Sequence, residues 1–389
     1  MSVETISLGC RLNFAESETL AALAPAGEDW TIVNSCAVTG EAVRQTRQAI
    51  RRAHRQRPDA RILVTGCAAE LEPESFRAMA GVTRVTGNPG TLSAFRQSDA
   101  MPSPVPAGLL HKVKSFVAIQ TGCDHRCTFC SIWQARGPSR SFAFEAVRDA
   151  VERELDRGAK EIVLTGVDIT DVAGGLGTLC QRLLAAIPAL GRLRLSSLDS
   201  IEIDEPLLEL IAGEPRLMPH FHLSLQAGDD MILKRMKRRH DRADAERTVE
   251  RIKTARPDAT IGADLIAGFP TESEDMALNT LKLIEDCDII AAHIFPFSSR
   301  PDTPAARMPQ VPREIIKARA ARLREAAAAR RSRWLDGLVG TALPVLIEGD
   351  GTGHSDSFAP VAIAGASRGE SGTMRVTGRD GDTLLGSWA

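Results

Sequence analysis

Three cysteines in one short loop are the residues of this chain best suited to chemistry. Cys123, Cys127 and Cys130 are spaced C-x3-C-x2-C in the run Gly-Cys-Asp-His-Arg-Cys-Thr-Phe-Cys. Three thiolates at this spacing can ligate three irons of a [4Fe-4S] cluster, which leaves the fourth iron open for a small ligand. The alternative is a zinc knuckle, with His125 or a distant side chain as the fourth ligand. Structural zinc loops usually pair two CxxC-like halves, so the spacing favours iron and sulfur.

Three more cysteines, Cys10, Cys36 and Cys67, recur in phase with the expected secondary structure of the N-terminal third. They close the short apolar runs 3–8, 31–33 and 61–65, each of which precedes a helical pattern. Their spacing approximates a βαβ repeat of about 30 residues, so a parallel sheet would carry all three thiols to its carboxyl edge. Open α/β sheets bind ligands at that edge. A lone cysteine would be read as a small buried hydrophobe, but three in phase favour a second iron–sulfur site.

Composition limits the class of protein. A chain of 389 residues with 43% hydrophobic residues is long and apolar enough for two or three packed domains. The net charge of −2 argues against a uniformly basic nucleic-acid coat and leaves room for local basic patches. The N-terminus shows no targeting segment, and no apolar run reaches the length of a membrane span. The sequence therefore predicts a cytoplasmic enzyme that keeps its thiols reduced.

The rest of the chain predicts an α/β protein in three parts. We expect a parallel α/β domain over residues 1–97, a proline-rich linker over 98–111, a barrel domain over 112–336 and a small β domain over 337–389. The barrel is a partial (βα)6 barrel, because strand-like runs alternate with helical patterns. Those runs are residues 116–120, 161–165, 193–196, 220–225, 260–266 and 289–297.

Two basic segments are candidates for contact with nucleic acid. Residues 44–57 hold six arginines and no acid, and residues 313–333 hold eight Lys or Arg against two glutamates. Solvated helix faces explain such runs as well as a phosphate-contacting surface does. Residues 338–389 are glycine-rich with β-like runs, but they hold six acids against three arginines, so no basic footprint is evident there.

The first cysteine loop, with Phe129 before its last cysteine, resembles the cluster site of the radical S-adenosyl-L-methionine (SAM) enzymes. The resemblance implies that the methionyl amino and carboxylate groups of SAM occupy the open iron. It also implies that Gly166, Val167, Ser197 and Gln226, at the carboxyl ends of barrel strands, surround SAM, with the backbone at Gly166 and Val167 meeting its amino group.

The N-terminal pattern Cys10-x-x-Asn13, Asn34-Ser-Cys36 and Gly66-Cys67 resembles the radical SAM methylthiotransferases. This resemblance implies two [4Fe-4S] clusters, the second of which carries or supplies sulfur, and a TRAM-like C-terminal domain. Cys180 and Cys287 lie outside both patterns and are expected to pack in the core. His220 and His222 are expected to be barrel histidines, because two histidines without a third ligand do not make a metal site.

Further segments resemble the bacterial branch of that family that methylthiolates N6-threonylcarbamoyladenosine in tRNA. The implied partners are a tRNA substrate, a reducing electron donor and a sulfur source, and a monomer is expected. One departure is Ser131-Ile-Trp-Gln after the third cysteine, where the family usually has aliphatic residues, proline and tyrosine. The alternatives are isopentenyladenosine in tRNA, an aspartate of a ribosomal protein, or a non-catalytic RNA-binding protein with structural zinc. The segments that carry this resemblance are 136–140, 195–199, 222–226, 264–270, 293–300 and 303–309.

Overall fold

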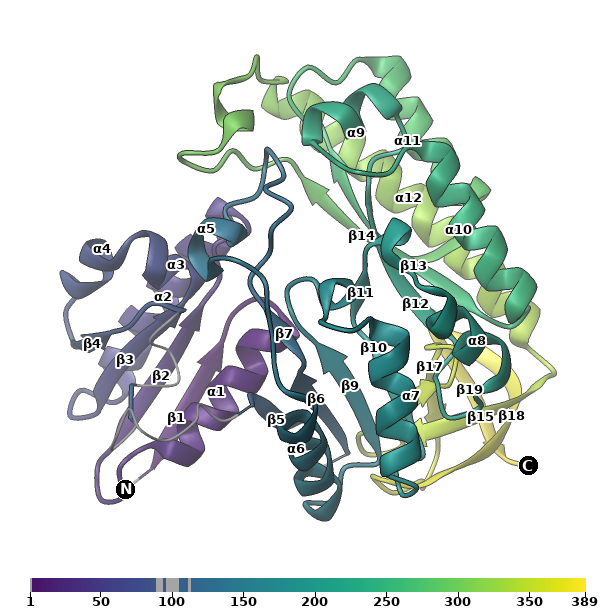
Figure 1. Ribbon diagram of the computed structural model, residues 1–389, viewed down its shortest axis with the longest axis horizontal. Helices are drawn as coiled ribbons and strands as arrows, with labels where there is room; N and C mark the ends of the chain where they lie inside the picture. Colours follow the sequence, from purple (N-terminus) through teal and green to yellow (C-terminus); the bar gives the residue numbers. More distant parts are fainter. Residues whose placement is uncertain (1, 89–93, 96–104, 111–112) are drawn as a thin grey trace.

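The computed structural model describes residues 2–88, 94–95, 105–110 and 113–389. Figure 1 shows a small α/β layer at the N-terminus beside an open barrel, with a compact β-barrel at the C-terminus. The expected linker lies partly outside the described residues. Its part Ala107–Leu110 forms strand β5, which pairs antiparallel with β6 (Lys114–Ala118) and so belongs to the barrel sheet. The prediction of a free linker is wrong for that stretch.

The N-terminal part is a four-stranded parallel sheet in the order β1-β2-β3-β4. Strand β2 is buried along its whole length, as expected for a sheet covered on both faces. Its helices are amphipathic: Val43, Thr46, Ile50 and Ala53 face inward from α2, and its arginines face outward. The elements are β1 (Val3–Ser7), α1 (Arg11–Leu23), β2 (Trp30–Ser35), α2 (Gly40–Gln56), β3 (Arg61–Gly66), α3 (Cys67–Leu71), α4 (Pro73–Arg77) and β4 (Val82–Val85).

The central part confirms the six expected barrel strands. Strands β10 and β11 follow each other directly; β10 pairs with β9 and β11 with β12, so two sheets join into one curved wall. Every pair among these wall strands, β6 and β9 to β14, is parallel, which brings their carboxyl ends to one rim. The strands are β6, β9 (Glu161–Thr165), β10 (Leu193–Leu195), β11 (Ser197–Leu198), β12 (His220–Gln226), β13 (Thr260–Ala267) and β14 (Ile289–Pro296).

Helices cover the outer face of this wall (Figure 1), and one continuous apolar cluster fills the space between helices and strands. Cys180 and Cys287 are fully buried in that cluster, as predicted. Two short strands, β7 (Gln120–Thr121) and β8 (Arg140–Ser141), form a ribbon beside the rim. The helices are α5 (Ile132–Arg136), α6 (Phe144–Asp156), α7 (Leu176–Ala186), α8 (Glu205–Gly213), α9 (Asp230–Met236), α10 (Arg242–Ala255), α11 (Glu274–Asp286) and α12 (Arg313–Leu338), with short 3-10 turns η2 (Ile169–Asp171), η3 (Ser200–Glu202) and η4 (Pro304–Arg307).

The C-terminal part is a closed five-stranded barrel in the order β15-β16-β17-β19-β18. These strands are β15 (Ala342–Ile347), β16 (Thr352–Ser355), β17 (Pro360–Ile363), β18 (Ser371–Asp380) and β19 (Thr383–Trp388). It confirms the expected small β domain. Among the described residues, no helix combines the length and the apolar character that a membrane span needs.

A loop of this β-barrel covers the amino end of the central barrel. Phe358 stacks between His220 and His354, with ring centroids 4.9 Å and 4.6 Å away. Beside it, Glu161 at the start of β9 pairs with Arg194 at 3.0 Å and with Lys114 at 3.2 Å. Lys114 also reaches Glu348 of the β-barrel at 2.8 Å. The two barrels therefore share a buried ionic and aromatic interface.

Candidate active site

The C-x3-C-x2-C loop lies at the rim where the parallel strands end. Gly122 opens it with a φ of 82°, and a Cβ there would stand 2.0 Å from the carbonyl oxygen of Pro138, so only glycine fits. The loop is tied to the end of α9 by Thr128, whose backbone N–H donates to Met236 and whose hydroxyl donates to Arg235. These bonds fix the path of the chain between the cysteines.

The spread of the thiols tests which metal group the loop can hold. Tetrahedral zinc with Zn–S bonds of about 2.3 Å places its sulfurs within about 3.8 Å of one another. In the described residues, no group of three ligand atoms within 4.8 Å contains two of the six cysteines Cys10, Cys36, Cys67, Cys123, Cys127 and Cys130. Cys123 does share such a group with His125 and Asp168, so one thiolate of the loop could help to hold a single cation there. The thiols of each triad are spread more widely than sulfurs around zinc, and a cubane cluster accepts that spread and suits soft thiolate donors.

Hydrogen bonds to sulfur add to this fit. The backbone N–H of Ile132 donates to Cys130 Sγ at 3.3 Å, and that of Val38 donates to Cys36 Sγ at 3.5 Å. Such bonds to cluster sulfurs help to set reduction potentials. The Arg238 guanidinium, from the turn after α9, lies 3.6 Å from Cys127 Sγ. The sequence pattern did not single out Arg238, because it is more than a hundred residues from the loop.

Cys127 differs electrostatically from the other thiols. Burial raises the pKa of Cys36 to about 11. Burial is also the largest influence on Cys127, but hydrogen bonds from His125 and Arg238 outweigh it and hold the pKa of Cys127 below its ordinary value. A thiolate is the form that binds metal, so Cys127 is the ligand best prepared before metal arrives.

His125 is the centre of an acidic cage that the sequence did not reveal. Its Nε2 lies 2.9 Å from Asp168 and 3.6 Å from Glu202, and its Nδ1 lies 3.4 Å from Asp199. Hydrogen bonding, first of all to Asp168, raises the pKa of His125 to about 12. His125 is thus a cation held by carboxylates from two other chain segments, Asp168 after β9 and Asp199 with Glu202 at η3, which is why spacing along the sequence gave no signal.

The residues expected around SAM lie on the same rim. Gln120 accepts hydrogen bonds from the backbone N–H groups of Val167 and Asp168, at 3.1 Å and 2.9 Å. This occupies the Val167 N–H group. Gly166 is packed so closely that a Cβ would meet Gln120 at 2.8 Å. Gln226 ends β12 with a φ of 67°, a strained conformation of the kind often found at functional sites. Ser197 is exposed at the start of β11.

The N-terminal cysteines occupy the carboxyl edge of their sheet, as the βα spacing predicts. Cys36 follows β2 and Cys67 follows β3, and both are buried, whereas Cys10 is exposed at the start of α1. Asn13 ties the site together, because its Nδ2 donates to the carbonyls of Leu8 and Ser35 at 3.0 Å and its Oδ1 accepts from Cys10 Sγ at 3.3 Å. Asn13 is the residue that the Cys-x-x-Asn pattern singled out.

Helix α5 joins the two cysteine triads. It begins directly after Cys130, where Ser131 donates to the carbonyl of Ala37, the neighbour of Cys36. At its other end, Arg136 is buried and donates to Glu16 at 2.7 Å and to Asn13 at 2.8 Å. Figure 1 shows α5 between the N-terminal layer and the barrel. The two triads are therefore connected through a single five-residue helix.

One further cluster lies inside the barrel. His222 and His293 each direct a ring nitrogen at the same oxygen of Asp264, at 2.9 Å and 3.0 Å. The sequence considered His222 with His220, but the structure pairs His220 with Thr260 at 2.9 Å instead. Burial raises the pKa of Asp264, but the two histidine hydrogen bonds outweigh it and hold that pKa well below its usual range.

Comparisons with known proteins agree with this geometry. Residues 117–284 match the model of the Radical SAM superfamily, and residues 2–87 match that of the Uncharacterized protein family UPF0004. The chain also resembles the solved structure of the radical SAM methyltransferase TsrM from Kitasatospora setae, with a TM-score of 0.54 over 75% of this chain and 66% of that one. At 16% identity, this likeness shows the fold alone. Fold and cysteine loop together define a radical SAM enzyme.

Curated relatives narrow the class. The chain is 43% identical to the threonylcarbamoyladenosine tRNA methylthiotransferase MtaB of Rickettsia prowazekii, over 92% of this chain and 91% of the relative. It is 31% identical to the MtaB of Thermotoga maritima, over 96% and 94%. It is also 33% identical to the tRNA-2-methylthio-N(6)-dimethylallyladenosine synthase of Erythrobacter litoralis, over 89% of this chain and 86% of the relative. The chain belongs to the radical SAM methylthiotransferase family.

Proposed function

We propose that this enzyme places a methylthio group on C2 of N6-threonylcarbamoyladenosine, next to the anticodon of tRNA. The observation that carries the proposal is the 43% identity to a relative named for this substrate, which extends over 92% of the chain. The two cysteine triads joined through α5 support it, because methylthiolation needs one site for SAM and one for sulfur.

In this proposal Cys123, Cys127 and Cys130 hold one [4Fe-4S] cluster and Cys10, Cys36 and Cys67 hold another. When bound, the clusters and SAM supply the radical that activates the adenine carbon and the sulfur and methyl group that replace its hydrogen. The chain itself positions and shields these groups. We assign the amino and carboxylate groups of SAM to the rim formed by Gly166, Val167, Ser197 and Gln226.

The charged groups beside the loop have defined roles in the proposal. Arg238 places a positive charge near Cys127, where it would favour the carboxylate of a bound SAM, and the ion contacts of His125 hold the cysteine loop against β9 and η3. Because the Val167 N–H already donates to Gln120, the backbone group of Val167 that we assign to a ligand ammonium is its carbonyl oxygen. Arg136 fixes the N-terminal triad relative to the rim through Asn13 and Glu16.

A second substrate is favoured by a specific observation. Relatives named for dimethylallyladenosine are 31–33% identical over most of this chain. Their identity is close to that of the Thermotoga maritima MtaB, so the family alone does not separate the two modified adenosines. Trp133 stands in the segment that departs from the usual pattern, and its indole N–H is buried without a partner in the described residues. It is a candidate for contact with the substrate side chain.

The experiment is a nucleoside profile. A strain that lacks this gene should lose 2-methylthio-N6-threonylcarbamoyladenosine from its tRNA and regain it on complementation, as measured by mass spectrometry of digested tRNA. If the strain loses the isopentenyl derivative instead, isopentenyladenosine is the substrate. An unchanged tRNA profile would contradict the proposal. We further propose a cytoplasmic monomer that receives electrons from a reduced donor protein and sulfur from a separate source.

A further inference from the structure

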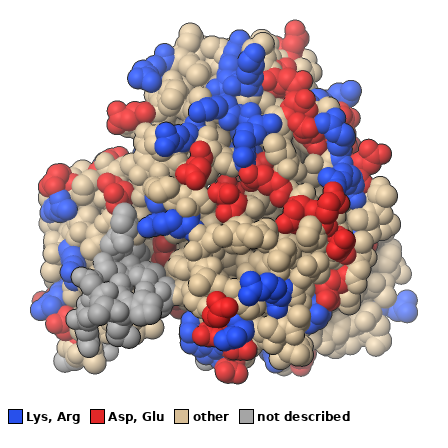
Figure 2. All heavy atoms as spheres, in the orientation of Figure 1, with Lys and Arg blue, Asp and Glu red and all other residues tan. Residues whose placement is uncertain are grey.

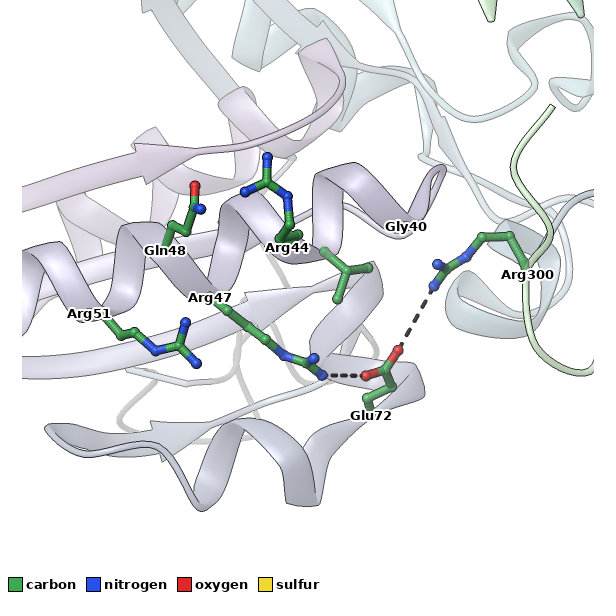
Figure 3. Close-up of a pocket in the computed structure, with 8 residues that line it drawn as sticks. Gly40, Arg44, Arg47, Gln48, Arg51, Glu72 and Arg300 are labelled. Carbon is green, nitrogen blue, oxygen red and sulfur yellow. Dashed lines mark hydrogen bonds and ion pairs between the residues drawn. The ribbon is translucent and has the colours of Figure 1, made fainter. Parts of the chain in front are cut away.

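We propose that a pocket between α2 and the loop after β14 binds one backbone phosphate of the RNA substrate. The cavity measures about 560 Å³. Its lining includes Arg44, Arg47, Arg51 and Arg300. Figure 3 shows Arg47 and Arg300 directed at Glu72, with Arg44 and Arg51 on α2 beside them and Arg44 pointing away from Glu72. Four arginines against one glutamate leave a formal surplus of three positive charges. The inference rests on the proposed function, because it takes RNA to be the substrate.

Arg300 is the residue that points to a missing ligand. Its exposed fraction is 6%, yet its Nε is buried with no hydrogen-bond partner among the described residues. Its one ion contact there is Glu72, at 3.9 Å, which is too long for a hydrogen bond. A buried guanidinium without a hydrogen-bonded partner costs free energy, and its five N–H donors match a phosphate or carboxylate. A bound anion that accepts hydrogen bonds from Arg300 would explain why this guanidinium is buried here.

The α2 side of the pocket has donors to spare. Arg47 is held by Glu72 at 2.6 Å and by Ser75 at 3.0 Å, so it mainly shapes the wall. Arg51 is exposed with no ion pair among the described residues, and Arg44 pairs only with the exposed Glu41 of its own helix. Exposed pairs of this kind are weak and exchange readily for a phosphate. Arg44, Arg51 and Arg300 are therefore the three donors available to a ligand.

The location favours RNA over a small anion. Gly40 begins α2 four residues after Cys36, so the pocket lies on the edge of the sheet that carries the N-terminal triad. The Gly40 N–H donates to Ser298 Oγ at 3.1 Å, which ties α2 to the same loop that carries Arg300. An RNA whose base reaches the triad must pass this seam. A phosphate bound here would hold the N-terminal layer and the barrel together on the substrate.

The test measures binding of an anticodon stem–loop RNA to the protein with both clusters. Arg300→Gln should weaken binding about tenfold or more and lower the slope of log K against log salt by about 0.7–0.9, the value of one phosphate contact. Arg44→Gln should act in the same direction. The matched control is Arg52→Gln, an exposed arginine on the same helix outside the pocket, which should change the affinity about twofold or less.

Two further measurements make the result specific. Neutral methylphosphonates placed one at a time along the RNA should weaken binding to the original protein at one position, and Arg300→Gln should abolish that effect. Thermal unfolding should show Arg300→Gln as stable as the original protein or more stable, since the substitution removes a buried charge without a partner. A large loss of stability would assign Arg300 a structural role and overturn the proposal.

The remaining outcomes separate this pocket from the proposed function. If the original protein modifies the RNA, while both pocket variants bind with unchanged affinity and salt slope, the pocket proposal fails alone. If these variants instead weaken binding of an acidic reductant such as flavodoxin, the pocket is a protein interface and the RNA proposal is wrong. If the original protein neither binds nor modifies RNA, the proposed function has failed first.

Discussion

At the scale of the residue, the two triads differ in how they are prepared for metal. His125 and Arg238 hold the pKa of Cys127 below its ordinary value, whereas burial raises the pKa of Cys36 to about 11 and so keeps that thiol protonated near neutral pH. Hydrogen bonds to the end of α9 also fix the loop of Cys123, Cys127 and Cys130. The N-terminal triad depends instead on the side chain of Asn13. We expect metal binding at Cys36 to release a proton, and the two clusters to assemble independently.

The first prediction separates the triads. Cys127→Ala should abolish SAM cleavage because it removes a ligand of the cluster that binds SAM. Cys36→Ala should lose half of the iron and all methylthiolation, while SAM cleavage continues without product. Iron analysis, spectroscopy of the clusters and assays of deoxyadenosine release check both. Retention of both clusters in Cys36→Ala would show that this cysteine is no ligand.

A second prediction concerns Arg136, whose ion pair with Glu16 is almost fully buried. Arg136→Met leaves the Glu16 carboxylate buried and unpaired, so it should destabilise the protein by about 3–5 kcal/mol. Arg136→Met combined with Glu16→Met removes both charges and should restore most of the stability. The double variant should still cleave more SAM per methylthiolated product than the original protein, because Asn13 Oδ1 has lost its hydrogen bond from Arg136. Chemical unfolding measures the stability, and the ratio of SAM cleaved to methylthiolated product measures the positioning. If the double variant cleaves no more SAM per product than the original protein, Arg136 has no positioning role.

At the scale of the element, the basic helices have different roles. Figure 2 shows Lys and Arg side chains gathered over the region of α9, with acidic side chains close by. On α12 the arginines have intramolecular partners: Arg319 pairs with Glu272 at 2.9 Å, Arg322 with Glu274 at 2.5 Å, and Arg330 with Asp288. The expectation that α12 offers a free basic face is therefore not supported. The pocket beside α2 is our candidate for contact with the RNA backbone.

The third prediction follows from this difference. Replacing Arg322 and Arg330 of α12 by Gln should leave the salt slope of RNA binding unchanged. Both side chains pair with Glu274 and Asp288, and they are 37% and 19% exposed, against 58% for Arg44. The same variant should lower the thermal unfolding midpoint by about 1–4 °C, since exposed pairs are worth up to about 1 kcal/mol each. Filter binding at several salt concentrations and calorimetry are the measurements. A reduced slope would return RNA contact to α12.

Sequence reasoning recovered what is local and periodic. The six barrel strands and the position of Cys10, Cys36 and Cys67 follow from hydrophobic runs and from the parallel topology that those runs require. Strand β5 was missed because it lies directly after a run of prolines, and only its pairing with β6 makes it a strand. The cage around His125 and the pocket around Arg300 were missed because the residues that form each of them come from distant segments. The ion pairs of α12 were hidden for the same reason.

At the scale of the whole molecule, the interface between the two barrels makes stability depend on pH. Burial raises the pKa of Glu348, but bonds with His354 and Lys114 outweigh it and bring that pKa down to about 2. The stabilisation is therefore present above the ordinary pKa of about 4.3 and is lost as the pH falls toward 2.

The fourth prediction uses this sign. Glu348→Gln should cost about 2–3 kcal/mol at neutral pH, and the difference from the original protein should narrow between about pH 5 and pH 2. Unfolding by denaturant across that range, with the metal-free protein, measures the difference. A gap that stays constant with pH would show that Glu348 acts by packing rather than by charge.

Phe358 covers the amino end of the radical SAM barrel. Because its ring is stacked between histidines of both barrels, the amino end of the radical SAM barrel is closed from below. Substrate and solvent must then enter from the rim, the same side as the cysteine loop. A chain that ends before residue 340 would expose Glu161 and Arg194 at the amino end of the barrel. Water would then reach a reactive intermediate from the end of the barrel opposite the cysteine loop.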